Sequence, residues 1–225
     1  MGVPVKAILF DVYGTLLDVH GVAATGERLF PGQGAALSAL WRTRQIDYTR
    51  LRTLSGRYAD FARVTADALD YALEALGLAA DAAARQQLVA AYETLPAFAD
   101  AGPALAGLKA GGVRLGVLSN GTPHMLSEGL GAVGLLGLFE QVLSVEAAQA
   151  YKTSPAAYRL GPAALGLPAA QIGFVSSNGW DIAGAGWFGF RTFWVNRRGE
   201  PPERLGIAPE ATGASLADLA AWAAG

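Results

Sequence analysis

The sequence predicts an α/β protein with a Rossmann-like open parallel sheet, flanked by helices and carrying an all-helical insertion. Short apolar runs recur along the chain without polar alternation, a pattern typical of strands that are buried on both faces. Helical stretches separate these runs, and strands that alternate with helices are typical of βαβ units. From about residue 19 to residue 96 no strand pattern occurs, which indicates a helical segment inserted after the first strand.

The first expected strand covers residues 5–10, an apolar run that ends at Asp11. The same pattern predicts further strands at 114–119, 139–143, 172–176 and 190–195. Helices are expected between and after them, at 103–110, 123–133, 155–165, 181–188 and 215–223. We therefore expect residues 1–18 and 97–225 to form an α/β core domain.

Residues 19–96 are predicted to form a helical cap domain. Apolar residues recur at helical spacing over 61–76, and Gly77 directly after this run is typical of a helix end. Further helices are expected around 37–41 and over 81–93. The cap would thus be a single insertion behind the first strand.

Composition excludes several classes of protein. The 225 residues carry a formal net charge of −2, which provides no general electrostatic reason to bind nucleic acid. The absence of Cys excludes disulfide scaffolds, thiolate catalysis and Cys-ligated zinc, and two His leave little for a His-rich metal site. The longest uncharged run, 160–180, contains Pro162 and Pro168 and is a poor membrane helix. Because the N-terminus also lacks a targeting pattern, we expect a cytoplasmic protein without membrane partners.

Four clusters of polar residues follow expected strands or their loops. They are Asp11 to Thr15, Ser119 with Asn120, Lys152, and Ser176 to Asp181. In a parallel α/β sheet, ligands bind outside the carboxyl ends of the strands, so these clusters are expected to converge on one site. Each cluster alone has a simpler interpretation, as a turn, a helix cap or a surface residue.

In this order and spacing, the four clusters resemble the motifs of the haloacid dehalogenase superfamily, and the inserted cap is part of the resemblance. Most members of that superfamily handle phosphate. Their phosphatases usually have a second Asp two positions after the nucleophile, where this chain has Tyr13, a poor acid or base near neutral pH. They also hold Mg²⁺ with acidic residues of the last motif, where this chain has only Asp181. The resemblance therefore implies a site without metal or other cofactor.

Both departures are similar to the L-2-haloacid dehalogenase branch. Further motifs match it: Trp41-Arg42-Thr-Arg-Gln45 in the cap, residues 174–181, and Tyr158 six positions after Lys152. Thr153 is a departure, because relatives commonly have Pro there. The resemblance implies hydrolysis of short L-2-haloalkanoic acids to D-2-hydroxyalkanoic acids and halide. Relatives are often homodimers, so a homodimer is expected.

The resemblance also implies the roles of the polar residues. Asp11 would attack the carbon that bears the halogen and form an ester on its own side chain. Lys152 would supply a positive charge, and the hydroxyls of Thr15 and Ser119 would orient the carboxylate. Ser176 is the candidate to hold Lys152.

Water would then attack the ester carbonyl. Asp181 and Asn178 are the candidates to position and deprotonate this water. The alternative for Asp181 is an ion-pair partner that only holds Lys152.

The remaining expected site residues bind halide and substrate. Arg42 from the cap and Asn120 from the core are the expected halide ligands. The apolar walls implied by the match are Tyr13, Ile46, Phe61 and Trp180. Phe61 has an alternative as ordinary cap core, and Tyr158 either hydrogen-bonds in the site or fills the core.

Two other functions stay open at the level of the sequence. One is a magnesium-dependent phosphatase or phosphonate hydrolase on the same scaffold. The other is a catalytically silent member that binds a small anion.

Overall fold

The computed structural model describes residues 5–224, and its centre is a parallel sheet. The strands are β1 (Ala7–Phe10), β2 (Arg114–Ser119), β3 (Gln141–Ser144), β4 (Ile172–Ser176), β5 (Arg191–Val195) and β6 (Ala211–Gly213). They lie in the order β3-β2-β1-β4-β5-β6, and each neighbouring pair is parallel. Strand β1 is therefore central, between β2 and β4.

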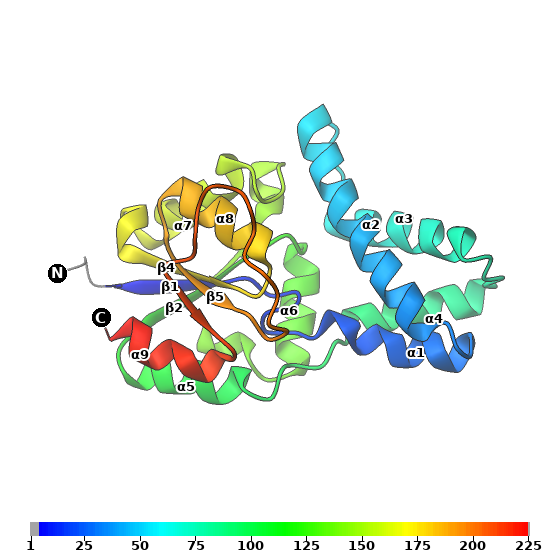
Figure 1. Cartoon of the computed structure of the whole chain (residues 1–225), viewed down its shortest axis with the longest axis horizontal. Helices are drawn as coiled ribbons and strands as arrows, with labels where there is room; N and C mark the ends of the chain where they lie inside the picture. The colour runs from blue at the N-terminus through cyan, green and yellow to red at the C-terminus, as the bar shows by residue number, and fades with distance from the viewer. Residues whose placement is uncertain (1–4, 225) are drawn as a thin grey trace.

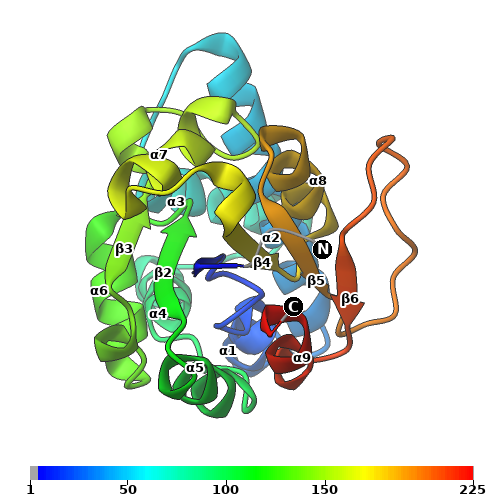
Figure 2. The same ribbon diagram turned by 90° about the vertical axis from the view of Figure 1, so that its left-hand side faces the viewer.

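Helices cover both faces of this sheet, which explains why its central strands are mostly apolar. On one face lie α7 (Pro155–Leu165) and α8 (Gly179–Phe188), and on the other α5 (Ala101–Ala110) and α9 (Leu219–Ala223) (Figure 1). Helix α6 (Pro123–Ala132) packs beside β3 (Figure 2). All four residues of β1 are fully buried, so this strand forms the middle of the core.

A separate group of four helices lies at the other end of the molecule (Figure 1). They are α1 (Val22–Leu29), α2 (Gly34–Ser55), α3 (Phe61–Ala75) and α4 (Ala82–Glu93). Helix α2 packs on both α1 and α3, and α1 packs on α4. We call these four helices the cap, and the sheet with its flanking helices the core. The chain crosses between them twice, side by side, since the Asp18 N–H donates to the Pro96 carbonyl oxygen at 2.8 Å.

The predicted fold class is confirmed, because the sheet is open and parallel, helices flank it and a helical group is inserted after β1. The expected strands and helices are present with their ends shifted by a few residues. The division of the chain between residues 18 and 19 and between residues 96 and 97 remains our proposal for the domain boundaries. Residues 1–4 of the first core segment lie outside the described residues. Short 3₁₀ helices connect the elements at Val19–Gly21, Leu136–Leu138, Val145–Ala148, Ala169–Gln171 and Leu216–Asp218.

Two elements were not predicted, β6 and α1. Strand β6 is a three-residue edge strand without a buried residue, so it carries no apolar pattern. Helix α1 packs closely on α2 at two glycines, Gly26 and Gly34. A Cβ on Gly26 would lie 3.2 Å from the Gly34 Cα, and one on Gly34 would lie 2.4 Å from the Ala23 carbonyl oxygen. Contacts of this kind leave little trace in hydrophobic periodicity.

Candidate active site

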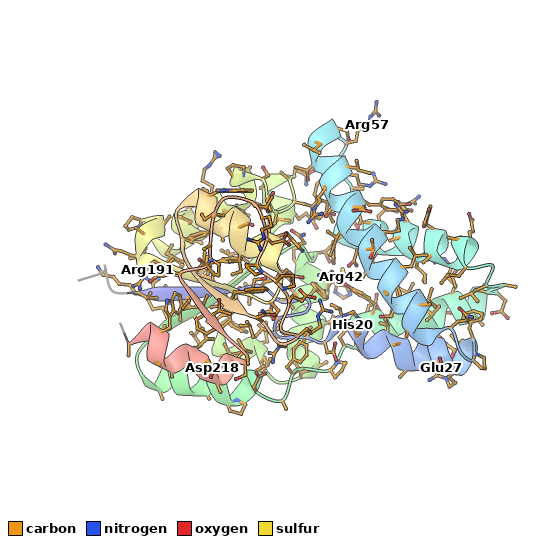
Figure 3. The ribbon with its side chains drawn as sticks, viewed as in Figure 1. His20, Glu27, Arg42, Arg57, Arg191 and Asp218 are labelled. Carbon is orange, nitrogen blue, oxygen red and sulfur yellow. The ribbon has the colours of Figure 1, made fainter. Side chains whose placement is uncertain are left out.

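The carboxyl ends of the three central strands meet at one edge of the sheet. Asp11 directly follows β1, Ser119 ends β2 and Ser176 ends β4. The pairing of Phe10 with Val117 on one side and with Val175 on the other brings these ends side by side. The cap lies over this edge, and Arg42 of α2 is placed where the cap meets the core (Figure 3).

The Asp11 carboxylate receives hydrogen bonds unequally at its two oxygens. Its Oδ2 accepts from Asn178 Nδ2 at 2.8 Å, from Thr15 Oγ1 at 3.0 Å and, weakly, from Ser176 Oγ at 3.4 Å. Its Oδ1 accepts from Lys152 Nζ at 3.1 Å. The side chain is buried but retains a small exposed area, because residue 11 is 6% exposed.

Lys152 is buried between two carboxylates. Its Nζ donates to Asp11 Oδ1 and, at 2.9 Å, to Asp181 Oδ2. Burial by itself lowers the pKa of Lys152, but attraction to Asp11 and Asp181 outweighs burial and raises the pKa above its usual range. The ammonium group therefore stays charged inside the protein.

Asp181 uses both of its oxygens within the protein. Oδ2 accepts from Lys152, and Oδ1 accepts from the Tyr158 hydroxyl at 2.7 Å. Burial and repulsion by Asp11 raise the pKa of Asp181 to about 6, against the opposing attraction of Lys152 and the hydrogen bond from Tyr158. A carboxyl group with this pKa can accept a proton near neutral pH.

A small cavity lies in front of Asp11, between the core and the cap. Its volume is about 10 Å³, about the space that one water molecule needs. The lining residues come from both parts of the chain: Asp11, Tyr13, Arg42, Ile46, Thr49, Phe61, Asn120, Asn178 and Trp180. All four expected apolar wall residues are among them.

A larger cavity of about 540 Å³ adjoins this inner cavity. The two share four lining residues, Arg42, Ile46, Asn178 and Trp180. The outer cavity continues between α2 and the segment after β5, and His20 lies on its wall (Figure 3). Movement of the shared side chains would join the two spaces.

Arg42 and Asn120 present nitrogen donors at the inner cavity. Arg42 donates through Nη1 to Gln45 Oε1 at 2.7 Å and through Nη2 to the Tyr13 carbonyl oxygen at 3.2 Å. Asn120 accepts from the Lys152 backbone N–H at its Oδ1, at 3.2 Å. Because this bond occupies the amide oxygen, the Nδ2 donors of Asn120 remain for a ligand.

Two expected roles do not match the contacts found. Ser176 Oγ contacts Asp11 and accepts from the Asn178 N–H, so the two carboxylates hold Lys152 in its place. Ser119 Oγ accepts from the Gly121 N–H instead of contacting Asp11, because the chain turns directly after β2. Tyr158 does not line the inner cavity, but its hydroxyl donates to Asp181 and its ring packs edge-on against Phe174, so it both hydrogen-bonds in the site and fills the core.

Phe61 fits both of its expected interpretations, as a wall of the site and as part of the cap core. It is 2% exposed and packs in the cap, and it also lines the inner cavity. Its ring centroid lies 5.4 Å from that of Tyr13, which in turn stacks on Tyr92 at 5.6 Å.

Sequence reasoning missed Thr49 and Tyr92, and it assigned no role to Gln45, which belongs to the matched cap motif. Thr49 lines the inner cavity with Arg42 and Ile46, and these positions share one face of α2 at helical spacing. Extending that periodicity by one turn from Ile46 would have found Thr49. Gln45 and Tyr92 contact Arg42 and each other through the cap interior, and no local pattern identifies such a contact.

The described residues, 5–224, contain no group of three or more His, Asp or Glu side chains arranged to hold a metal ion. In the same part of the chain, every helix is too short or too polar to cross a lipid bilayer.

Comparisons with known proteins agree with this architecture. Residues 5–189 match the haloacid dehalogenase-like hydrolase family. An (S)-2-haloacid dehalogenase of Pseudomonas sp. (strain YL) is 43% identical over 206 residues, covering 92% of this chain and 89% of that protein. A crystal structure of an L-2-haloacid dehalogenase, 52% identical, matches with a TM-score of 0.97 over 99% of this chain and 100% of the other. The Xanthobacter autotrophicus L-2-haloacid dehalogenase with chloropropionic acid covalently bound is 36% identical, with a TM-score of 0.93 over 98% and 99%. The chain therefore belongs to the haloacid dehalogenase-like hydrolases.

Proposed function

We propose that the protein hydrolyses short L-2-haloalkanoic acids to D-2-hydroxyalkanoic acids and halide, through an ester on Asp11. One observation carries this proposal: the Asp11 carboxylate, paired with a buried ammonium, faces a small cavity with aromatic walls and the nitrogen donors of Arg42 and Asn120. The similarity to L-2-haloacid dehalogenases supports it.

In the first step, a lone pair of an Asp11 oxygen forms a bond to C2 of the substrate. The carbon–halogen bond breaks on the opposite side, and the halide leaves with its electron pair, which inverts C2. We assign the attack to Oδ1, since Oδ2 accepts hydrogen bonds from Asn178, Thr15 and Ser176, while Oδ1 accepts from Lys152 alone among residues 5–224. Fewer donors leave a carboxylate oxygen more nucleophilic.

The leaving halide needs hydrogen-bond donors in a dry site. Arg42 and the Nδ2 group of Asn120 line the inner cavity and are our candidates. Donors already in place as charge develops lower the barrier, because they need no reorganisation in the transition state.

In the second step, water attacks the ester carbonyl carbon of Asp11. The carbonyl oxygen, Oδ2 under this assignment, becomes negatively charged and is stabilised by the donors of Asn178, Thr15 and Ser176. Removing one such donor typically costs about 3–4 kcal/mol of transition-state stabilisation.

The attacking water must also lose a proton. We propose Asp181 as its acceptor, because the pKa of this carboxyl group is raised to about 6. Asp181 is fully buried and does not line the inner cavity, so this role requires water to reach it once the ester has formed. When the intermediate collapses, the bond between the Asp11 carboxyl carbon and the substrate oxygen breaks, and Asp181 returns its proton to that oxygen. The second proton of the water is released from Asp11 to solvent, which restores the carboxylate.

The hydrogen-bond donors around Asp11 favour metal-independent hydrolysis over a magnesium-dependent phosphatase reaction. Three hydrogen-bond donor groups, the amide of Asn178 and the hydroxyls of Thr15 and Ser176, surround Oδ2. Mg²⁺ requires oxygen acceptors arranged as an octahedron, and an amide nitrogen does not ligate it. We therefore propose metal-independent hydrolysis.

The direct test is chloride release from L-2-chloropropionate by purified protein in excess chelator. We expect chloride and D-2-hydroxypropionate in equal amounts, and no release by Asp11→Asn. Phosphate release that requires magnesium, without chloride release, would favour the phosphatase alternative. Tight binding of the haloacid without turnover, unchanged in Asp11→Asn, would favour a silent anion-binding member.

A single turnover in isotopically labelled water tests the ester itself. The label should appear in the Asp11 carboxylate before it appears in product. Direct transfer of the label to product would contradict the ester mechanism.

We further propose a cytoplasmic homodimer. The end of α2 extends beyond α3 (Figure 1) and carries Leu51 and Leu54, 60% and 85% exposed. Exposed apolar side chains on a protruding helix suit burial against a second copy of the chain. Light scattering of the purified protein should give twice the chain mass, and Leu54→Glu should shift the measured mass towards that of the monomer. Cell fractionation tests the cytoplasmic location.

A further inference from the structure

A buried amide connects Arg42 to the interior of the cap. Gln45, one turn after Arg42 on α2, is fully buried. Its Oε1 accepts from Arg42 Nη1 at 2.7 Å and from the Tyr92 hydroxyl at 3.0 Å. Its Nε2 donates to Thr65 Oγ1 at 2.7 Å, so Gln45 joins three elements of the cap.

Chemistry determines the orientation of this amide. A guanidinium group only donates, so the atom of Gln45 that faces Arg42 must be the oxygen. Burial raises the pKa of Tyr92 above its usual range, which keeps its hydroxyl protonated as the second donor. The Thr65 hydroxyl donates to the Phe61 carbonyl oxygen at 2.6 Å and therefore accepts from Gln45.

The contact restrains Arg42, which in the described part of the chain is the one cationic side chain that lines the inner cavity. Arg42 also lines the outer cavity, where its guanidinium would find space to turn away from Asp11. Two acceptors oppose this movement, Gln45 in the cap and the Tyr13 carbonyl oxygen in the core. Of these, the Tyr13 contact is the longer, at 3.2 Å, and it depends on closure of the cap over the core.

We propose that Gln45 is a positioning residue that holds the Arg42 guanidinium towards the inner cavity, where it receives the departing halide. This inference rests on the proposed dehalogenase function. Gln45 does not line the inner cavity, so it would act through Arg42 alone.

The test compares Gln45→Met with Trp41→Phe. Methionine keeps the length of the side chain and lacks the acceptor for Arg42. Trp41→Phe is the matched control, since it removes another buried hydrogen bond of α2 to Thr65, from Nε1 to the carbonyl oxygen at 2.8 Å, without touching Arg42. Both variants should lose stability to a similar extent.

Only Gln45→Met should weaken halide binding. Loss of a hydrogen bond to a charged group should raise the inhibition constant for product chloride about tenfold or more and lower kcat. Trp41→Phe should leave both near the wild-type values. Equal effects of the two variants on chloride inhibition would overturn the proposal.

A second readout does not depend on turnover. NMR relaxation of the Arg42 Nε–Hε group should show a rigid side chain in the wild type and in Gln45→Glu, which retains an acceptor. It should show a mobile one in Gln45→Met, and a rigid Arg42 there overturns the proposal even if Gln45→Met activity is low. If wild-type protein releases no chloride, the dehalogenase function fails, while the relaxation data still decide whether Gln45 positions Arg42.

Discussion

Asp11 and Asp181 share a single ammonium group. Lys152 Nζ lies 3.1 Å from Asp11 Oδ1 and 2.9 Å from Asp181 Oδ2, and none of the three side chains is more than slightly exposed. The nucleophile, its counter-charge and the candidate base thus form one electrostatic unit. Because Lys152 lowers the pKa of Asp181 and Asp11 raises it, a change at either neighbour alters the protonation of Asp181.

Lys152→Met should destabilise the protein and abolish turnover. Removing one partner of a buried ion pair leaves uncompensated carboxylates, at a typical cost of about 3–5 kcal/mol. Without the ammonium, the pKa of Asp181 rises further in the folded state, so the stability deficit should grow as the pH rises above about 6. Urea unfolding at several pH values measures this, with surface Lys109→Met as the control. A deficit independent of pH would contradict the shared-ammonium arrangement.

Asp181→Asn should separate the two chemical steps. If Asp181 is the base, the ester still forms and is not hydrolysed, so one equivalent of halide appears per active site and turnover then stops. Rapid-quench measurement of chloride, with mass spectrometry of the Asp11 peptide, detects this burst. Slow halide release without accumulated ester would instead assign Asp181 to holding Lys152.

Tyr158→Phe should move the acidic limit of activity to higher pH. Asp181 must be ionised to accept a proton, so kcat should decline as the pH falls below about 6. The Tyr158 hydroxyl donates to the ionised carboxylate and lowers the pKa of Asp181. Removing this donor therefore raises the pKa of Asp181, and the acidic limb of the kcat–pH profile should move to higher pH. Tyr71→Phe, at a partly exposed position of the cap, is the control, and an unshifted limb in Tyr158→Phe would refute the assignment.

Ile46→Ala should broaden the accepted chain length. Ile46 lines both the inner and the outer cavity, so truncating it enlarges the space beside the substrate. One methylene in an apolar pocket typically changes discrimination about tenfold or more. We expect the ratio of kcat/KM for L-2-chlorobutyrate over L-2-chloropropionate to rise by about this factor. A parallel fall for both acids would indicate lost packing instead, and exposed Leu54→Ala should leave the ratio unchanged.

The predicted elements differ in how far local patterns specify them. Strands β2 and β4 match their expected bounds, because their apolar runs coincide with burial of every residue except Arg114. The cap helices α3 and α4 begin after Asp60 and Asp81, which cap them through the backbone N–H groups of Arg63 and Ala84. Helix α1 escaped prediction, because its packing depends on glycines that meet only when α1 and α2 are folded together.

The sequence by itself determined the α/β class, the inserted cap and the residues that meet at the sheet edge. Apolar periodicity and strand-end polar residues are local signals, and the order of the strands brings the latter together. Tertiary structure alone decided which side chains of the site contact one another. It shows Lys152 held by Asp11 and Asp181 rather than by Ser176, Tyr158 behind Asp181, and Gln45 against Arg42. Hydrogen bonds depend on ångström-scale positions of side chains far apart in the chain, and residue type and spacing do not contain that information.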